Sequence, residues 1–150
     1  MAKIHFHVET QLAPAEVLRV LTDFGEHRAD VWPNIDAAHF QLHELGPDRA
    51  DVTEGSSIAG GVWERERYEW DAAAGRVSIV TTDSNTWGPG SRWDSLRARS
   101  GGGTDVDVHV VRNGKGAKGR LVELVVALVG PRRLRGDLER VLARAAAGPA

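Results

Sequence analysis

Strict alternation of apolar and polar residues marks the beginning of the chain. In "KIHFHVET" the apolar residues Ile4, Phe6 and Val8 fall on one side of an extended backbone. The lysine, the two histidines and the glutamate between them fall on the other side. A period of two is typical of a strand with one buried face, so we expect the chain to begin with such a strand.

The period changes to that of a helix directly afterwards. In "APAEVLRVLTDF", Val17, Leu21 and Phe24 recur at spacings of four and three residues. Pro14 stands where a first helical turn tolerates proline, so the segment predicts an amphipathic helix of two to three turns. A second short helical turn is expected within "GEHRADVWPNID". It should end at Trp32, because a residue before proline is biased away from helical backbone angles.

Extended segments separated by turns follow, from about residue 37 to residue 112. The segments are "AAHFQLHEL", "RADVTEG", "GVWERERYEW", "RVSIVTTDSN", "RWDSLRARS" and "TDVDVHVVR". Glycine- and proline-containing turns divide them, as between antiparallel strands. The last segment is the clearest, because three valines alternate with two aspartates and a histidine. We therefore expect about six antiparallel strands after the short helices.

Two helical segments, "RLVELVVALV" and "RRLRGDLERVLARAAA", close the chain. The apolar positions expected on one helical face are Leu121, Leu124, Val125, Leu128, Leu134, Leu138, Val141 and Leu142. Pro131 should kink or interrupt the helix after Val129. A sheet with one apolar face would pack against this long helix, in a single domain over residues 1–147 with a short tail at residues 148–150.

The composition narrows the class of protein. The 150 residues are 41% hydrophobic and 27% charged, which is typical of an ordinary globular domain. The absence of cysteine excludes disulfides, thiolate metal sites and a cysteine nucleophile. No apolar run approaches the roughly 20 residues of a membrane span, and the first residues lack the apolar centre of a signal peptide. We expect a cytoplasmic protein without stable membrane insertion.

Charge is unevenly distributed along the chain. Residues 1–111 carry a net charge of −8, whereas residues 112–150 carry +6. A basic C-terminal segment fits contact with nucleic acid or an anionic membrane, or the solvated side of a helix that lies on an acidic body. We favour the solvated helix. The aromatic residues of the segment 61–70 alternate with glutamates, which argues against a nucleic-acid surface.

Four segments together carry a resemblance to a known family. They are "APAEVLRVLTDFGEHRADVWPNI", "GVWERERYEWD", "SGGGTDVDVHV" and the long terminal helix. In this order they resemble the SRPBCC superfamily of START-like, helix-grip proteins, in particular its polyketide cyclase/dehydrase-like branch. The resemblance implies an α+β fold with two short helices after the first strand. In this fold a curved, seven-stranded antiparallel sheet wraps around the C-terminal helix.

The resemblance also implies a cavity between sheet and helix. Such a cavity holds a hydrophobic, lipid- or polyketide-like small molecule and opens near "VWPNI". In the aromatase/cyclase relatives a tryptophan and an arginine of the strand equivalent to 61–70 point inward, which implies the same for Trp63, Arg65 and Arg67. Packing argues the reverse, because Tyr68 and Trp70 bury more apolar area than two arginines. We retain the inward arginines as the prediction, beside the alternative that they bridge surface acids.

Two sets of candidate residues follow from this orientation. The predicted cavity wall consists of Trp32, Phe40, Trp63, Arg65, Arg67, Ile79, Asp83, Trp87, Leu96 and Val108. Asp83 or Asp94 would partner the buried arginines. On the opposite face an exposed aromatic patch is expected to form a homodimer or partner interface, and its residues are Tyr68, Trp70 and Trp93.

No catalytic motif accompanies the predicted cavity. The chain has no nucleophile elbow, no phosphate-binding glycine loop and no paired acid motif. In an enzyme, Arg65 or Arg67 would stabilise enolate charge during aldol closure or dehydration, but a convincing general acid or base is missing. We therefore rank a binding protein above an enzyme. The alternative is a protein–protein interaction module that uses the aromatic patch or the basic C-terminal helix.

The histidines are poor candidates for metal ligands. His5 and His7 share one face of the first strand, and Asp107 and His109 join them if the first and last strands pair. All four occupy the polar side of their strands, which faces solvent, and a closed zinc site needs four well-placed ligands. We predict no metal and no cofactor.

Overall fold

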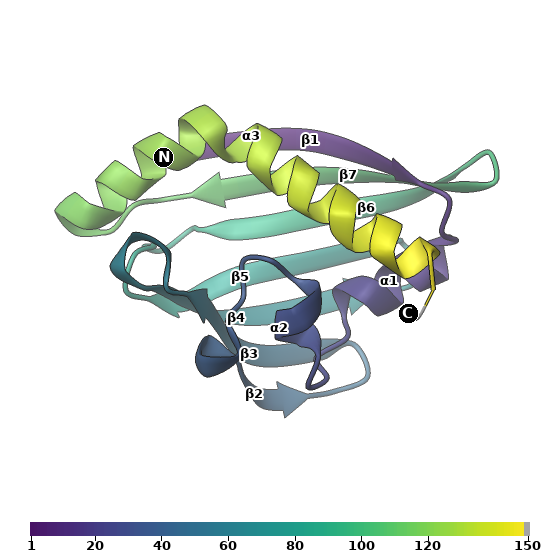
Figure 1. Ribbon diagram of the computed structural model, residues 1–150, viewed down its shortest axis with the longest axis horizontal. Coiled ribbons are helices and arrows are strands. Elements are labelled where there is room, and N and C mark those ends of the chain that lie inside the picture. The colour runs from purple at the N-terminus through teal and green to yellow at the C-terminus, as the bar shows by residue number, and fades with distance from the viewer. Residues whose placement is uncertain (149–150) are drawn as a thin grey trace.

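A curved antiparallel sheet of seven strands is the centre of the fold (Figure 1). The computed structural model describes residues 1–148. Its strands are β1 (Ala2–Thr10), β2 (Gln41–Leu45), β3 (Arg49–Ser56), β4 (Val62–Asp71), β5 (Arg76–Ser84), β6 (Arg92–Ser100) and β7 (Gly103–Arg112). They lie in the order β1-β7-β6-β5-β4-β3-β2, so β2 to β7 form a continuous meander and β1 joins its far edge.

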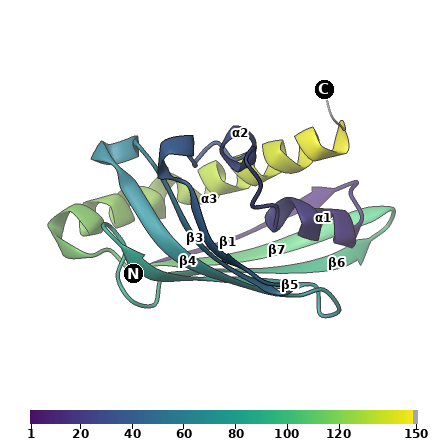
Figure 2. The same cartoon turned by 90° about the horizontal axis from the view of Figure 1, so that it is seen from below.

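The helices cover one face of this sheet. They are α1 (Pro14–Leu21), α2 (Arg28–Val31), the 3₁₀ turns Ala37–His39 and Ile58–Gly60, and the long α3 (Gly116–Ala146). Figure 2 shows α1, α2 and α3 on the same, concave side of the sheet. The predicted α+β helix-grip fold is therefore confirmed. A short tail was expected at residues 148–150. Of these, residues 149 and 150 lie outside the described residues.

Alternation along β1 and β7 builds the first part of the core. Ile4 lies opposite Val110, and Phe6 lies opposite Val108, on the face that α3 covers. These four side chains are at most 7% exposed. Directly opposed apolar pairs stabilise a sheet through packing and burial. Val108 was predicted to line a cavity. It is instead a fully buried core residue.

The long helix α3 continues through Pro131 without interruption. Figure 1 shows that its axis changes direction near the middle, where the ribbon passes from green to yellow. Proline lacks the amide hydrogen that an interior helical residue donates, which accounts for a bend at this point. The preceding Gly130 is buried, and a Cβ there would lie 2.9 Å from Ile4 Cδ1. Glycine thus allows the helix to approach β1 closely at the bend.

The sheet-facing side of α3 differs from the predicted one in its first half. A row at every fourth position faces the sheet, and it contains Val122, Val126, Gly130, Leu134, Leu138 and Leu142. The residues left at least half exposed on the other side are Leu121, Leu124, Val125, Leu128 and Val129. Apolar residues surround nearly the whole circumference of this segment, so periodicity alone could not select its buried face. Within residues 1–148, no helix has the length and apolar character needed to cross a membrane.

Candidate ligand cavity

A cavity of about 270 Å³ lies between the concave face of the sheet and α3. Its volume is near the lower end of the range for small-molecule sites, about 300–1,000 Å³. The aromatic and aliphatic part of its wall includes Trp32, Ile35, Val77, Ile79, Trp87, Trp93, Val122, Val126, Leu134 and Leu138. The ionisable part consists of Arg28, Glu54, Glu64, Glu66, Tyr68, Arg112 and Asp137. The cavity is thus mainly apolar, with charged groups gathered from several elements.

The predicted orientation of β4 is wrong. Glu66 and Tyr68 face inward and are 7% and 4% exposed, whereas Arg65 and Arg67 are exposed on the outer face. Burying Tyr68 removes more apolar area from water than burying an arginine would. The inward glutamates are tolerated because arginines from distant elements reach two of the cavity's carboxylates, a feature that the local sequence does not contain.

The expected exposed aromatic patch does not form, because its residues belong to the inner face. Tyr68 packs edge-on against Phe24, with ring centroids 4.9 Å apart, and Trp93 packs edge-on against Phe6 at 5.9 Å. Trp70 lies beside Phe24, at 6.3 Å between centroids. Because Tyr68 is buried and Trp70 and Trp93 pack partly buried against the core, the surface on which a homodimer or partner contact was predicted does not form.

The other predicted wall residues are divided between inside and outside. Trp32, Ile79 and Trp87 lie on the cavity wall. Phe40 packs against the core without lining the cavity. The remaining residues do not line the cavity either, because they point to the outer face of their strands. They are Trp63, Asp83 and Leu96. On β4 an error of one position moves Trp63, Arg65 and Arg67 together from the inner to the outer face.

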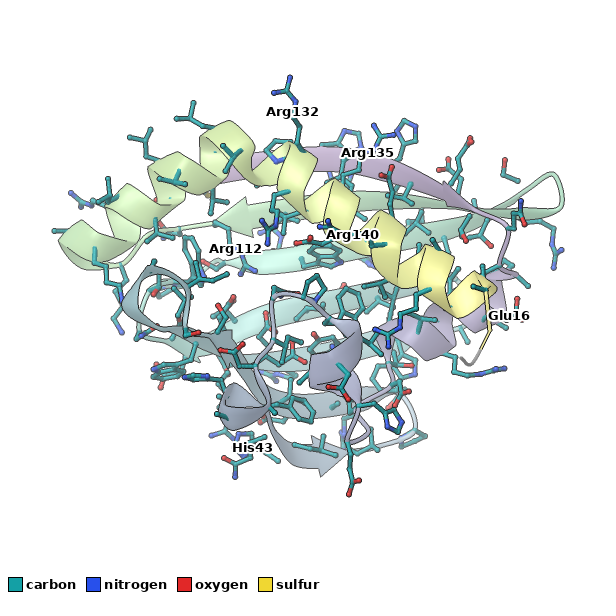
Figure 3. The ribbon with its side chains drawn as sticks, in the orientation of Figure 1. Glu16, His43, Arg112, Arg132, Arg135 and Arg140 are labelled. Atoms are coloured by element: carbon teal, nitrogen blue, oxygen red, sulfur yellow. The ribbon has the colours of Figure 1, made fainter. Side chains whose placement is uncertain are left out.

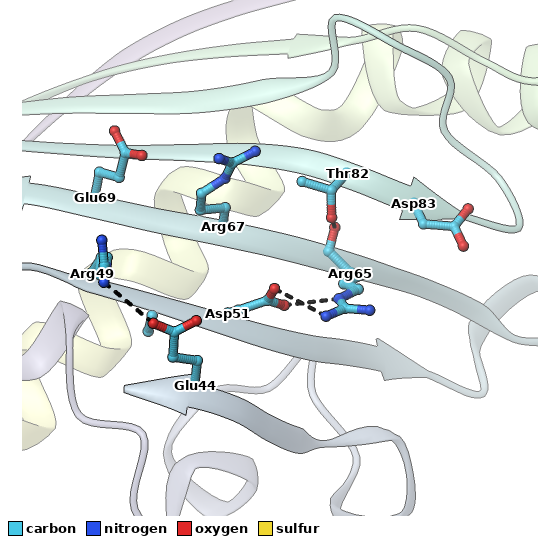
Figure 4. A pocket seen from close by; sticks show the side chains of 9 residues that line it. Glu44, Arg49, Asp51, Arg65, Arg67, Glu69, Thr82 and Asp83 are labelled. Atoms are coloured by element: carbon cyan, nitrogen blue, oxygen red, sulfur yellow. Dashed lines mark hydrogen bonds and ion pairs between the residues drawn. The ribbon is translucent and has the colours of Figure 1, made fainter. Parts of the chain in front are cut away.

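The two arginines predicted for the cavity instead border an open groove on the outer face of the sheet (Figure 4). Arg65 donates two hydrogen bonds to Asp51, from Nε at 2.9 Å and from Nη2 at 3.0 Å. The hydrogen bond from Arg65 lowers the pKa of Asp51. Asp94, considered as a partner for these arginines, instead pairs with Arg92 at 3.2 Å. Arg65 thus forms an ion pair with a carboxylate on the surface. Solvent-exposed ion pairs of this kind contribute little to the free energy of folding.

The first charged network inside the cavity connects α2 with β3 and β4. Arg28 is 4% exposed, and its Nε donates to a carboxylate oxygen of Glu54. Its Nη2 donates to the Tyr68 hydroxyl at 3.0 Å, and that hydroxyl donates to the other Glu54 oxygen at 3.1 Å. The guanidinium also lies 4.5 Å from the Phe24 ring centroid. Because the buried ion pair has these additional hydrogen bonds, the cost of its desolvation is offset.

The second charged network connects β4 with β5 and β7. Arg112, labelled in Figure 3, donates from Nη1 to Glu64 Oε2 at 2.7 Å. The Thr81 hydroxyl donates to the same carboxylate oxygen at 2.9 Å. The Arg112 guanidinium stacks 5.3 Å from the Trp87 ring centroid. This contact ties Trp87 and its loop to the cavity wall.

The basic face of α3 is largely occupied by contacts within the chain. Arg133 and Arg140 both pair with Asp137, which is 5% exposed, and Arg135 pairs with Glu139. Arg144 donates to the carbonyl oxygen of Asp30 at 2.9 Å. Figure 3 shows Arg132 projecting away from the sheet. Four of these five arginines therefore have partners within the chain, and Asp137 and Glu139 balance part of their charge.

His5, Asp107 and His109 meet on the outer face of β1 and β7. The imidazole rings stack with centroids 4.1 Å apart, and Asp107 contacts His5 Nε2 at 2.6 Å and His109 Nε2 at 3.0 Å. These hydrogen bonds, chiefly the one with His5, lower the pKa of Asp107. The group offers three candidate metal ligands among the described residues. A closed zinc site has four, and a carboxylate between two ring donors is already hydrogen-bonded without a metal.

Six charged residues of the wall were missed at the sequence level: Arg28, Glu54, Glu64, Glu66, Arg112 and Asp137. One signal in the sequence could have identified two of them. Glu64 and Glu66 alternate with the same period as Tyr68, so they lie on the same face of the strand. Had packing decided the orientation, these glutamates would have been placed inside. The arginines carry no comparable signal, because they approach the cavity from α2 and from the end of β7.

Comparisons with known proteins establish the fold. No protein-family profile and no curated protein sequence matches the chain. Among solved structures, the protein TTHA0849 from Thermus thermophilus superposes with a TM-score of 0.80 at 15% identity, over 99% of both chains. The Zhui aromatase/cyclase from a Streptomyces species has a TM-score of 0.75 at 16% identity, covering 99% of this chain and 98% of that one.

A START superfamily protein from Mycobacterium smegmatis also matches, with a TM-score of 0.71 at 14% identity, over 96% of this chain and 99% of its own. The chain therefore has the helix-grip fold found in START superfamily and polyketide aromatase/cyclase structures. The fold implied by the sequence resemblance is the fold observed.

Proposed function

We propose that the protein binds a hydrophobic, lipid- or polyketide-like small molecule in the cavity between the sheet and α3. The observation that carries this proposal is the cavity wall itself. Trp32, Trp87 and Trp93 line it beside aliphatic side chains from β5 and α3. A concave, mainly apolar site with a few converging polar groups is the usual form of a small-molecule site. Proteins of the same fold that are described as aromatase/cyclase or START proteins support this proposal.

Binding without turnover is the preferred form of this function. The catalytic role considered for Arg65 and Arg67 is withdrawn, because both side chains lie outside the cavity. The arginines that reach the cavity, Arg28 and Arg112, are each engaged by a glutamate. An arginine so neutralised is a weaker stabiliser of a developing enolate than a free one. The alternative of an interaction module has lost its aromatic patch, and the exposed apolar side of α3 is the observation that still favours it.

Filling the cavity tests the proposal directly. Val126 lies on the cavity wall and Leu128 lies on the exposed side of the same helix. Val126→Trp should abolish binding of a fluorescent flavonoid probe, whereas Leu128→Trp should leave the affinity for this probe unchanged. Native mass spectrometry of freshly purified protein should detect a retained hydrophobic molecule in the wild type and not in Val126→Trp. Equal probe affinity in the two variants, with no retained mass in either, would refute the proposal.

A further inference from the structure

Three glutamates reach the cavity from neighbouring strands, and one of them differs from the others. Glu54 pairs with Arg28, and Glu64 pairs with Arg112. Glu66 is 7% exposed, yet within residues 1–148 its carboxyl group forms neither a hydrogen bond nor an ion pair. Buried polar groups in folded proteins nearly always have a hydrogen-bond partner. Glu66 therefore stands out as an unpartnered group on the wall of the cavity.

The surroundings of Glu66 determine its charge. Burial raises its pKa well above the usual value, and the neighbouring carboxylates Glu64 and Glu54 add to the effect. Arg112 and Arg28 lower the pKa of Glu66, but each arginine already balances the charge of one of those two carboxylates. The remaining ionisable wall groups are Tyr68 and Asp137, neither of which supplies positive charge. A third negative charge would be uncompensated, so these surroundings favour the neutral acid form of Glu66 over the carboxylate.

A second unpartnered donor lies on the same wall. The Nε1 atom of Trp93 is buried, and the described chain offers it no hydrogen-bond acceptor. An indole N–H can only donate, and a neutral carboxylic acid offers an O–H donor. The residues of the cavity wall thus include two polar groups without a hydrogen-bond partner in the described chain. A molecule that satisfies them must carry a hydrogen-bond acceptor, such as a carbonyl oxygen.

We propose that Glu66 in its acid form donates a hydrogen bond to a carbonyl oxygen of the bound molecule, so that the cavity selects uncharged, apolar molecules with a carbonyl group. This inference rests on the proposed function and names the ligand class for that same cavity. Trp93 supplies the second donor. Anionic ligands such as fatty-acid carboxylates are disfavoured, because both cavity arginines are already neutralised by Glu54 and Glu64. Amines are disfavoured because a cation would require Glu66 to ionise.

Three matched naphthalene derivatives separate these ligand classes. They are 2-acetylnaphthalene, which has a carbonyl group, 2-ethylnaphthalene, which is purely apolar, and 1-(2-naphthyl)ethylamine, which is cationic. Titration calorimetry on the full chain should show that the acetyl compound binds about fivefold to tenfold more tightly than the ethyl compound, the fold-change expected of one hydrogen bond. The amine should bind more weakly than the acetyl compound.

Variants of Glu66 assign this preference to its O–H group. Glu66→Leu should lose the preference for the acetyl compound over the ethyl compound. Glu66→Gln should retain the preference, because its amide N–H still donates. Trp93→Phe should reduce the preference. Glu69→Leu, on the exposed side of the same strand, is the matched control and should behave as wild type.

The outcomes distinguish the two proposals. If the wild type binds none of the three compounds, both the ligand class and the proposed function are overturned. If it binds the acetyl and ethyl compounds equally, or if Glu66→Leu keeps the preference, cavity binding stands and the role of Glu66 is refuted. Tighter binding of the amine would likewise refute it, since Glu66 would then be a carboxylate that holds a cation. Should Glu66→Leu fail to fold, the comparison of the acetyl compound with the amine on the wild type still tests whether Glu66 acts as a neutral donor.

Discussion

Glu54 on β3 and Glu64 on β4 lie directly opposite each other, and each carboxylate is bound by a different arginine. Like charges in directly opposed positions destabilise a sheet unless other groups compensate them. Arg28 compensates Glu54 from α2, and Arg112 compensates Glu64 from β7. These two ion pairs thus hold the short helix α2 and the strand β7 against the cavity wall.

Loss of Arg28 should strongly destabilise the fold. Arg28→Met leaves Glu54 buried without its partner, and breaking a buried ion pair costs about 3–5 kcal/mol. Urea denaturation should show this loss of unfolding free energy, and the double variant Arg28→Met/Glu54→Leu should recover much of it. Arg65→Met removes an exposed pair and should leave the denaturation midpoint nearly unchanged. Equal effects of Arg28→Met and Arg65→Met would contradict the buried network.

Glu66 should make stability fall as pH rises. Its folded-state pKa is raised by burial and by Glu64 and Glu54, so the folded protein binds its proton more tightly than the unfolded chain. The stabilisation is fully present below the unfolded-state pKa of about 4.3. It is lost as pH rises toward and through the raised folded-state pKa. Denaturation between pH 4 and 8 should therefore show wild type losing stability relative to Glu66→Gln. Parallel pH profiles for the two proteins would show that Glu66 does not titrate in this way.

Two neighbouring glycines where the turn after β6 passes into β7 should respond differently to alanine. A Cβ at Gly103 would lie 2.0 Å from the carbonyl oxygen of Thr10, whereas a Cβ at Gly102 meets nothing within 4 Å. Gly103→Ala forces the backbones of β1 and β7 apart, so we expect a cost of about 1–3 kcal/mol. Gly102→Ala should change stability by less than about 0.5 kcal/mol. Thermal unfolding compares the two, and a stable Gly103→Ala variant would argue against this close approach.

Truncations along α3 should report which side of the helix is buried. Leu138 is 1% exposed and Leu124 is 59% exposed, although the sequence pattern assigned both to one face. Leu138→Ala should cost about 2–5 kcal/mol through lost burial and a cavity. Leu124→Ala should change stability by less than about 0.5 kcal/mol. A large loss in Leu124→Ala would mean that another surface covers this side in solution.

Regular local patterns could be interpreted correctly without the structure. Alternation in β1 and β7 identified their buried faces, and the proline after Trp32 identified the end of α2. The order of elements led to the helix-grip fold. These features follow from contacts among neighbouring residues or from a strict period, so the sequence itself contains the information.

The sequence by itself determined the strands, the helices and the face that each clearly amphipathic element buries. Tertiary structure alone decided the face of β4, because neither side of "GVWERERYEW" is purely apolar. Its glutamates can be buried only because Arg28 and Arg112 arrive from elements far away in the chain. The buried side of the first half of α3 was likewise decided by packing, since apolar residues surround it. Ion pairs and packing between distant segments therefore determine which residues line the cavity. Neither kind of contact produces a periodic pattern in the local sequence from which it could be predicted.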